Sequence, residues 1–230
     1  MSNSEVPLLV VTGVRKSFAG VPLLNDISFT LLAGSVTILT GRNGSGKSTL
    51  VNCLAGFDRN YEGDVVLCGA NLRGVSSEER ARLGLVRTFQ SPHLFTDLEV
   101  VQNLQLAQSA RMPALRSYFT SQAGQAPSEI IGEFELRLLL KRLSGRLSYG
   151  EMKTVNTARA FSTNAKVLLL DEPLASLHRH RRELVVQAIA SKAQTGSAVL
   201  VVEHELQGLT RIADAHYDLV DGRLISVDRS

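Results

Sequence analysis

The chain has 230 residues, of which 44% are hydrophobic and 20% are charged, and its net charge is +3. This composition is ordinary for a soluble globular protein, and a chain of this length can bury a large core without disulfides or metals. The net charge is too small to indicate nucleic-acid binding by itself, so no nucleic-acid partner is expected.

The cysteines and the apolar runs indicate the cellular compartment of the chain. Cys53 and Cys68 each fall within an apolar pattern, which predicts buried thiols in a reducing compartment rather than a disulfide. Residues 1–5 lack the basic and apolar pattern of a secretory signal. Runs such as 167–170 and 198–202 are far shorter than the ~20 residues that span a bilayer. We therefore expect a cytosolic chain.

The first ninety residues alternate between strand and helix patterns. Apolar alternation predicts strands at 8–14, 26–32, 35–40 and 64–68. A helix is expected at 48–57, and its inward-facing residues would be Leu50, Val51, Leu54 and Ala55. A second, short helix is expected at 78–83, with Ser76 or Ser77 as its N-cap.

The second half opens with a mostly helical stretch from 97 to about 142, interrupted at Met112-Pro113 and at 124–127. A turn at 147–150 leads into a helix that ends near Phe161. The remaining elements are two buried parallel strands, a helix between them and two short closing strands, expected at 167–170, 198–202, 182–192, 217–220 and 223–227.

A glycine-rich loop carries the most specific chemistry. Its residues Gly41, Arg42, Asn43, Gly44, Ser45, Gly46, Lys47 and Ser48 fit the pattern G-x-x-x-x-G-K-[ST]. The glycines let successive backbone N–H groups point at phosphate oxygens, Lys47 neutralises the β and γ phosphates, and Ser48 ligates Mg²⁺. Thr49 continues into a helix whose N-terminal end attracts anions. The alternative is an ordinary glycine-rich turn.

Two carboxylates end the apolar strand at 167–170. Asp171 is placed to hold Mg²⁺ beside the phosphate-binding loop, and Glu172 is placed to orient and deprotonate an attacking water. Many strands end in acidic residues, so this pair is informative only together with the loop. The two motifs together predict a bound nucleotide and Mg²⁺, and the resemblance described next implies that the nucleotide is ATP.

Taken together, these residues resemble the ABC ATPase family over nearly the whole chain. The segment Leu147-Ser148-Tyr149-Gly150-Glu151 is similar to the family signature, usually written LSGGQ. The resemblance implies that Ser148 and the Gly150 backbone contact the γ-phosphate of ATP held by a second ATPase subunit. Taken alone, this pentapeptide would be an N-cap and a turn.

Three further residues match the family by position. The resemblance implies that Gln90 reaches Mg²⁺ and the water, that His204 binds the γ-phosphate and holds Glu172, and that Phe18 stacks on adenine. The alternatives are a polar loop residue, a structural histidine and a core phenylalanine.

The chain departs from the family at His178, where an aspartate usually stands in the loop that crosses the dimer interface. Either the loop tolerates the histidine, with Ser176 making the important contact, or the coupling between subunits is weakened. The basic run 178–182 is interpreted as the solvated start of a helix, and binding of nucleic acid or acidic lipid is its alternative.

The resemblance is strongest to the ATPases of branched-chain amino-acid and urea importers, on the run 87–90 and the segments 94–98 and 101–104. Those relatives usually carry a longer C-terminal tail, so the substrate stays open.

The expected fold is α/β: a P-loop NTPase with a RecA-like core, an N-terminal antiparallel β subdomain and a helical insert. The ATPase domain would span 6–229, with the core at 6–90 and 147–229 and the helical subdomain at 91–146.

The implied function is the energy-coupling subunit of a transporter on the cytoplasmic face of the cell membrane. Its partners would be a second ATPase subunit, polytopic permease subunits and, for an importer, a solute-binding protein. The alternative is a soluble ABC ATPase without a transport role, for example in cluster assembly.

Overall fold

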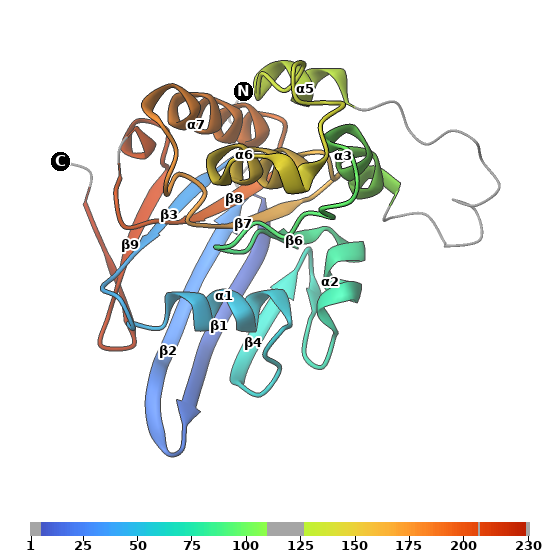
Figure 1. The fold of residues 1–230 in the computed structure, drawn as a ribbon. Helices are drawn as coiled ribbons and strands as arrows, with labels where there is room; N and C mark the ends of the chain where they lie inside the picture. The colour runs from blue at the N-terminus through green and yellow to red at the C-terminus, as the bar shows by residue number, and fades with distance from the viewer. Residues whose placement is uncertain (1–5, 110–126, 207, 229–230) are drawn as a thin grey trace.

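The computed structural model describes residues 6–109, 127–206 and 208–228. Two β-sheets form separate layers, with helices between and above them (Figure 1). The first sheet is antiparallel and has the strand order β2-β1-β4-β5. Its strands are β1 (Pro7–Phe18), β2 (Val21–Leu32), β4 (Glu62–Leu67) and β5 (Ala70–Asn71). This sheet confirms the predicted N-terminal antiparallel subdomain.

The second sheet has the order β10-β9-β3-β8-β7-β6 and is parallel except for the β9–β10 hairpin. Its strands are β3 (Val36–Thr40), β6 (Leu85–Arg87), β7 (Val167–Asp171), β8 (Ala198–Val202), β9 (Ala215–Val220) and β10 (Arg223–Ser226). Strand β8 lies between β3 and β7, so the ends of these three strands meet at one edge of the sheet. The phosphate-binding loop and the acidic pair are therefore brought together.

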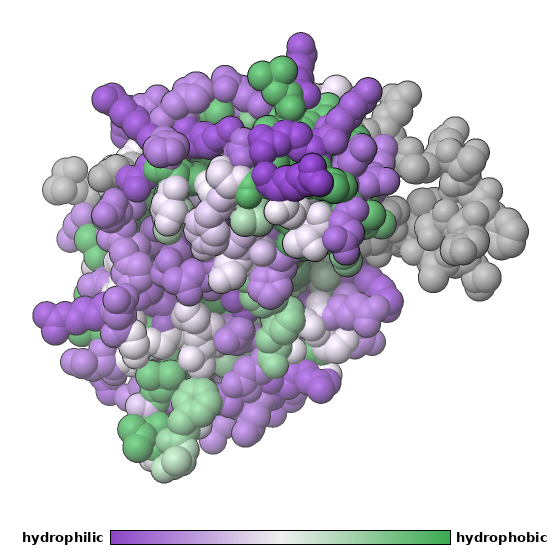
Figure 2. All heavy atoms as spheres, viewed as in Figure 1, coloured by the Kyte–Doolittle hydropathy of each residue, from purple (hydrophilic) through white to green (hydrophobic). Residues whose placement is uncertain are grey.

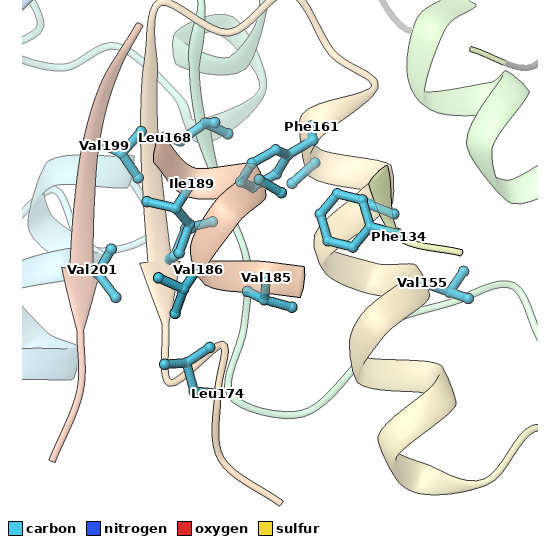
Figure 3. Packing of buried hydrophobic residues seen from close by; sticks show 14 of the residues in the cluster. Phe134, Val155, Phe161, Leu168, Leu174, Val185, Val186, Ile189, Val199 and Val201 are labelled. Carbon is cyan, nitrogen blue, oxygen red and sulfur yellow. The ribbon is translucent and has the colours of Figure 1, made fainter. Parts of the chain in front are cut away.

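Strands β7 and β8 are buried on both faces, as their uninterrupted apolar runs predict. Leu168 and Val201 pack into the core beneath α6 (Tyr149–Phe161) and α7 (Arg179–Gln194), which Figure 3 shows from close by. Leu169 and Leu200 face the other core, which is formed with α1 (Lys47–Ala55) and the antiparallel sheet. The central sheet thus separates two hydrophobic cores.

The remaining described helices are short. They are α2 (Ser77–Leu83), α3 (Val100–Ser109), α5 (Ser128–Glu133) and the 3-10 turns at Ser144–Arg146 and Leu209–Arg211. Ser76 caps α2, and its side chain accepts a hydrogen bond from the backbone of Glu79, which confirms one of the two predicted caps. Among the described residues no helix is long and apolar enough to cross a membrane.

The helical prediction from 97 to 142 is only partly right, because residues 135–141 form turns rather than a helix. The predicted break at Met112-Pro113 and most of the break at 124–127 lie outside the described residues. Strand β6 was not predicted, since three residues are too few to show alternation.

The prediction that both cysteines are buried is wrong for Cys68. Cys53 is fully buried, and burial raises the pKa of its thiol to about 12. Cys68 is exposed because it lies in the tight turn between β4 and β5, with a φ of 48°. The apolar pattern of β4 ends one residue earlier than the sequence suggested. Both thiols are free, as predicted.

Candidate nucleotide site

The loop between β3 and α1 is shaped by its glycines. Gly41 has a φ of 150°, and a Cβ there would lie 2.6 Å from the Ser45 hydroxyl oxygen and 2.8 Å from the Leu219 carbonyl oxygen. Gly46 has a φ of 105° and lies against the side chains of Leu23 and Leu24. A side chain at either position would therefore displace the loop.

The start of α1 offers donors to an anion. The residue before the helix, Gly46, provides no side-chain cap, and the first turn contains no acidic residue. Its first N–H groups have no partner within the helix, and they carry the positive end of the helix dipole. The Ser45 hydroxyl is buried without a hydrogen-bond partner among the described residues. This terminus suits a phosphate, which would supply the missing acceptors.

The side chain of Lys47 folds back onto the phosphate-binding loop. Its ammonium donates to the carbonyl oxygens of Gly41 at 2.7 Å and Arg42 at 2.9 Å. Burial lowers the pKa of Lys47, and the nearby carboxylates of Glu172 and Asp171 oppose this shift. The Lys47 side chain is thus held over the loop. A phosphate bound there would replace the two carbonyl oxygens as the acceptor of the Lys47 ammonium.

Asp171 ends β7 in a buried ion pair. Its carboxylate lies 3.2 Å from the guanidinium of Arg87, which also donates to the side-chain oxygen of Asn52 on α1. The guanidinium lies 4.4 Å from the ring centre of Phe89 and 5.4 Å from that of Phe57. Burial raises the pKa of Asp171, and the charge of Arg87 lowers it. Arg87 therefore orients the carboxylate that was predicted to hold Mg²⁺.

Two of the predicted residues, Gln90 and His204, contact the carboxylate of Glu172. The amide nitrogen of Gln90 donates to one carboxylate oxygen at 2.9 Å, and Nε2 of His204 lies 3.2 Å from the other. The three side chains come from the segment after β6, the end of β7 and the end of β8. Gln90 and His204 thus both contact the carboxylate of Glu172, one at each oxygen.

The oxygen atoms near the loop suit Mg²⁺. Ser48 would supply a hydroxyl, Asp171 a carboxylate and Gln90 its amide oxygen, and Mg²⁺ binds such ligands together with substrate phosphates. Within the described residues, no group of three or more His, Cys, Asp or Glu side chains could hold a metal ion alone.

Ser148 and Gly150 make only local hydrogen bonds in the described part of the chain. Ser148 caps α6, its side chain accepting from the backbone of Glu151 at 3.3 Å while the Glu151 carboxylate accepts from Ser148 at 2.8 Å. The Gly150 carbonyl accepts from Thr154. The loop after β7 lies against this turn, because a Cβ on Gly150 would be 3.5 Å from the Ser176 carbonyl oxygen. Within one chain, the signature therefore acts as a helix cap.

His178 is the N-cap residue of α7, but its side chain makes no capping hydrogen bond. The following residue, Arg179, is highly exposed, as expected for the solvated start of a helix. An aspartate at position 178 would accept from the helix backbone, which a histidine does not do here.

Phe18 ends β1 with half of its surface exposed, so the alternative of a core phenylalanine is wrong. The buried ammonium of Lys16 lies 5.0 Å from its ring centre. Figure 2 shows apolar residues gathered at the lower tip of the molecule, where β1 turns into β2 and where Phe18 and Val21 are exposed. The ring of Phe18, which contacts Lys16 on one side, is exposed and could stack on a planar base.

Sequence reasoning missed three charged residues at this site: Arg87, Lys153 and Glu203. Each is a charged residue within or beside an apolar pattern, in β6, in α6 and directly after β8. That pattern was a usable signal, since a buried charge requires a partner.

A phosphate-binding loop after a central parallel strand, facing carboxylates at the end of a neighbouring strand, defines a P-loop nucleoside triphosphatase. Residues 24–175 match the family model described as ABC transporter. The chain belongs to this family of ATP-binding subunits, and it is an ATPase that binds ATP.

The relatives agree with this assignment. The chain is similar to the high-affinity branched-chain amino acid transport ATP-binding protein LivG of Salmonella typhimurium, with 31% identity over 94% of this chain and 89% of the relative. It is 33% identical to the galactose/methyl galactoside import ATP-binding protein MglA of Pasteurella multocida, over 97% of this chain and 44% of that protein. The ADP conformation of MJ1267, an ATP-binding cassette of an ABC transporter, superposes with a TM-score of 0.80 at 29% identity, covering 96% of this chain and 90% of that one.

Proposed function

We propose that this ATPase is the energy-coupling subunit of a membrane importer for amino acids or other small polar solutes. The observation that carries the catalytic part is the convergence of Gln90 and His204 on the carboxylate of Glu172. The relatives LivG and MglA, which are named for amino-acid transport and sugar import, support the transport part.

The reaction would be the in-line attack of water on the γ-phosphate of ATP. Lys47 and the N–H groups of the loop stabilise the charge on the phosphates, while Glu172 accepts the proton of the water. Gln90 and His204 hold the carboxylate of Glu172 and the water in position. Bound Mg²⁺, held by Ser48, Asp171 and Gln90, would neutralise phosphate charge.

The site is proposed to be shared between two subunits. Among the described residues Ser148 and Gly150 make only local hydrogen bonds, and we propose that they contact the γ-phosphate of ATP held by a second ATPase subunit. The Ser148 hydroxyl and the N-terminus of α6 are suited to an anion. Closure of the dimer on ATP and its opening after hydrolysis would drive the membrane partner.

The proposed partners are polytopic permease subunits and, outside the membrane, a solute-binding protein, with this chain attached to the cytoplasmic face. The test is a pull-down of the tagged chain from detergent-solubilised membranes, with identification of stoichiometric partners. We expect polytopic proteins in the complex. Recovery of soluble proteins alone would favour the second candidate, a soluble ABC ATPase.

A further inference from the structure

Lys153 is a buried lysine on the signature helix α6, and the mechanism described above does not use it. Its side chain is 5% exposed, and its ammonium donates to the backbone carbonyl oxygen of Glu172 at 2.6 Å. Burial lowers the pKa of Lys153, and the negative charges of Glu203 and Glu172 oppose this shift. A buried ammonium is costly unless it is well paired, so this contact is a specific one.

The backbone that Lys153 contacts is in an unfavourable conformation. Glu172 has a φ of 48°, which residues with a side chain rarely adopt. Its N–H donates to the Val202 carbonyl oxygen at 2.9 Å, and its own carbonyl oxygen accepts from Lys153. The conformation of Glu172 is therefore fixed from β8 on one side and from α6 on the other.

Glu203 holds the next part of the same segment. Its carboxylate accepts from the Leu174 backbone N–H at 2.7 Å, and its own N–H donates to the Leu39 carbonyl oxygen at 3.2 Å. The side chain is buried, and in its ionised form it attracts the ammonium of Lys153. Residues 172–174 are thus held by a lysine from α6 and a glutamate beside His204.

We propose that Lys153 is a positioning residue that sets the direction of the Glu172 side chain and couples the signature helix to it. This inference rests on the proposed function, because it matters for hydrolysis only if Glu172 is the base. The N-terminal end of α6 carries Ser148 and Gly150, which are proposed to face the nucleotide of the other subunit. The same helix would then touch both ATP sites of a dimer, and a shift of α6 would move the base.

The test is Lys153→Met, which keeps the chain length but removes the donor. We expect kcat for ATP hydrolysis to fall at least about tenfold, since a base misplaced by about 1 Å can cost two orders of magnitude. Binding of a fluorescent ATP analogue should stay within about twofold, as Lys153 touches no loop residue in the described contacts. If Lys153→Met does not bind the analogue, Lys153→Gln, whose side chain ends one bond short, replaces it.

A double-mutant cycle with Glu172→Gln separates positioning from a general loss of structure. If Lys153 acts through Glu172, Lys153→Met should not slow single-turnover hydrolysis further when Glu172 is already glutamine. An equal loss in both backgrounds, or a wild-type kcat for Lys153→Met, would overturn the inference.

The matched control is Lys192→Met. Lys192 donates to the carbonyl oxygens of Phe161 and Thr163 at the other end of α6, far along the helix from Glu172. Its kcat should stay within about twofold of the wild type. If Glu172→Gln alone hydrolyses ATP at the wild-type rate, Glu172 is not the base and the proposed mechanism is wrong. This single variant is measured first, so that such a result is distinguished from a failure of the inference on Lys153.

Discussion

Glu203 binds its proton more tightly when the chain folds. Burial raises the pKa of this carboxyl to about 7, from an ordinary value of 4.5, although hydrogen bonding by Leu174 and the charge of Lys153 oppose the shift. The folded protein therefore holds this proton more tightly than the unfolded chain does. The stability from Glu203 is complete below pH 4.5 and is lost as the pH rises through about 7.

We predict that Glu203→Gln removes this part of the pH dependence. The glutamine keeps an acceptor for the Leu174 N–H but cannot ionise. Between pH 5 and 8 the wild type should lose up to about 3 kcal/mol relative to the variant, from the size of the shift in pKa. Urea unfolding at the two pH values measures this difference. Glu205→Gln, at an exposed neighbouring residue, should behave like the wild type; an equal pH slope in wild type and Glu203→Gln would refute the prediction.

The aromatic ring of Phe18 is the candidate surface for stacking on adenine. Its ring is half exposed and therefore contributes little to the core. If it stacks on adenine, Phe18→Ala should weaken ATP binding about tenfold, which is about 1.4 kcal/mol. The free energy of unfolding should change by less than about 0.5 kcal/mol. Titration with ATP measures the effect, with Val21→Ala as the exposed apolar control; unchanged affinity would remove Phe18 from the site.

At the scale of the elements, α1 depends on α2 for its C-terminal end. Arg80 is fully buried, and its guanidinium donates to the carbonyl oxygens of Cys53 at 2.8 Å and Leu54 at 2.7 Å in the last turn of α1. It also donates to the Leu72 and Val75 carbonyl oxygens. The Cys53 and Leu72 carbonyl oxygens also accept from the N–H groups of Gly56 and Val75, so Arg80 is the one described donor only to Leu54 and Val75.

Arg80→Met should destabilise the fold by about 3 kcal/mol, since it removes four hydrogen bonds of a buried guanidinium to backbone carbonyl oxygens and leaves those of Leu54 and Val75 without their described donor. Arg82→Met, on the exposed face of the same helix, removes only a surface ion pair with Glu78 and should cost less than about 0.5 kcal/mol. Chemical denaturation compares the two. Equal effects would show that the buried contacts of Arg80 contribute nothing specific.

Elements with a clear local pattern could be predicted, whereas the 12-residue strands β1 and β2 were predicted only in part, at 8–14 and 26–32. The helix after the loop was predicted from its period, β7 and β8 from their continuous apolar runs, and the cap of α2 as either Ser76 or Ser77, of which Ser76 is the cap. The short β6 could not be found this way, and neither could the turns at 135–141, because local signals there are too brief. Cys68 was misplaced by one residue of register at a turn.

On the scale of the whole molecule, the motifs and the resemblance indicated the candidate site residues and the contact of His204 with Glu172, but not the contacts of Arg87 and Lys153. The pairing of Arg87 with Asp171 joins residues 84 positions apart, and that of Lys153 with Glu172 depends on how α6 crosses the end of β7. The first contact follows from the pairing of β6 with β7 and the second from the position of α6, and the sequence states neither. The proposed contact of Ser148 and Gly150 with a nucleotide depends on a second chain, which a single sequence does not contain.

The central claim is that Glu172 is the base for ATP hydrolysis at the loop formed by residues 41–48. The most direct test measures ATP binding and ATP turnover side by side for the wild type and Glu172→Gln. We predict that the variant binds ATP as tightly as the wild type, hydrolyses it at least about a hundredfold more slowly and accumulates as an ATP-bound dimer. Hydrolysis by Glu172→Gln within about twofold of the wild-type rate would contradict the account.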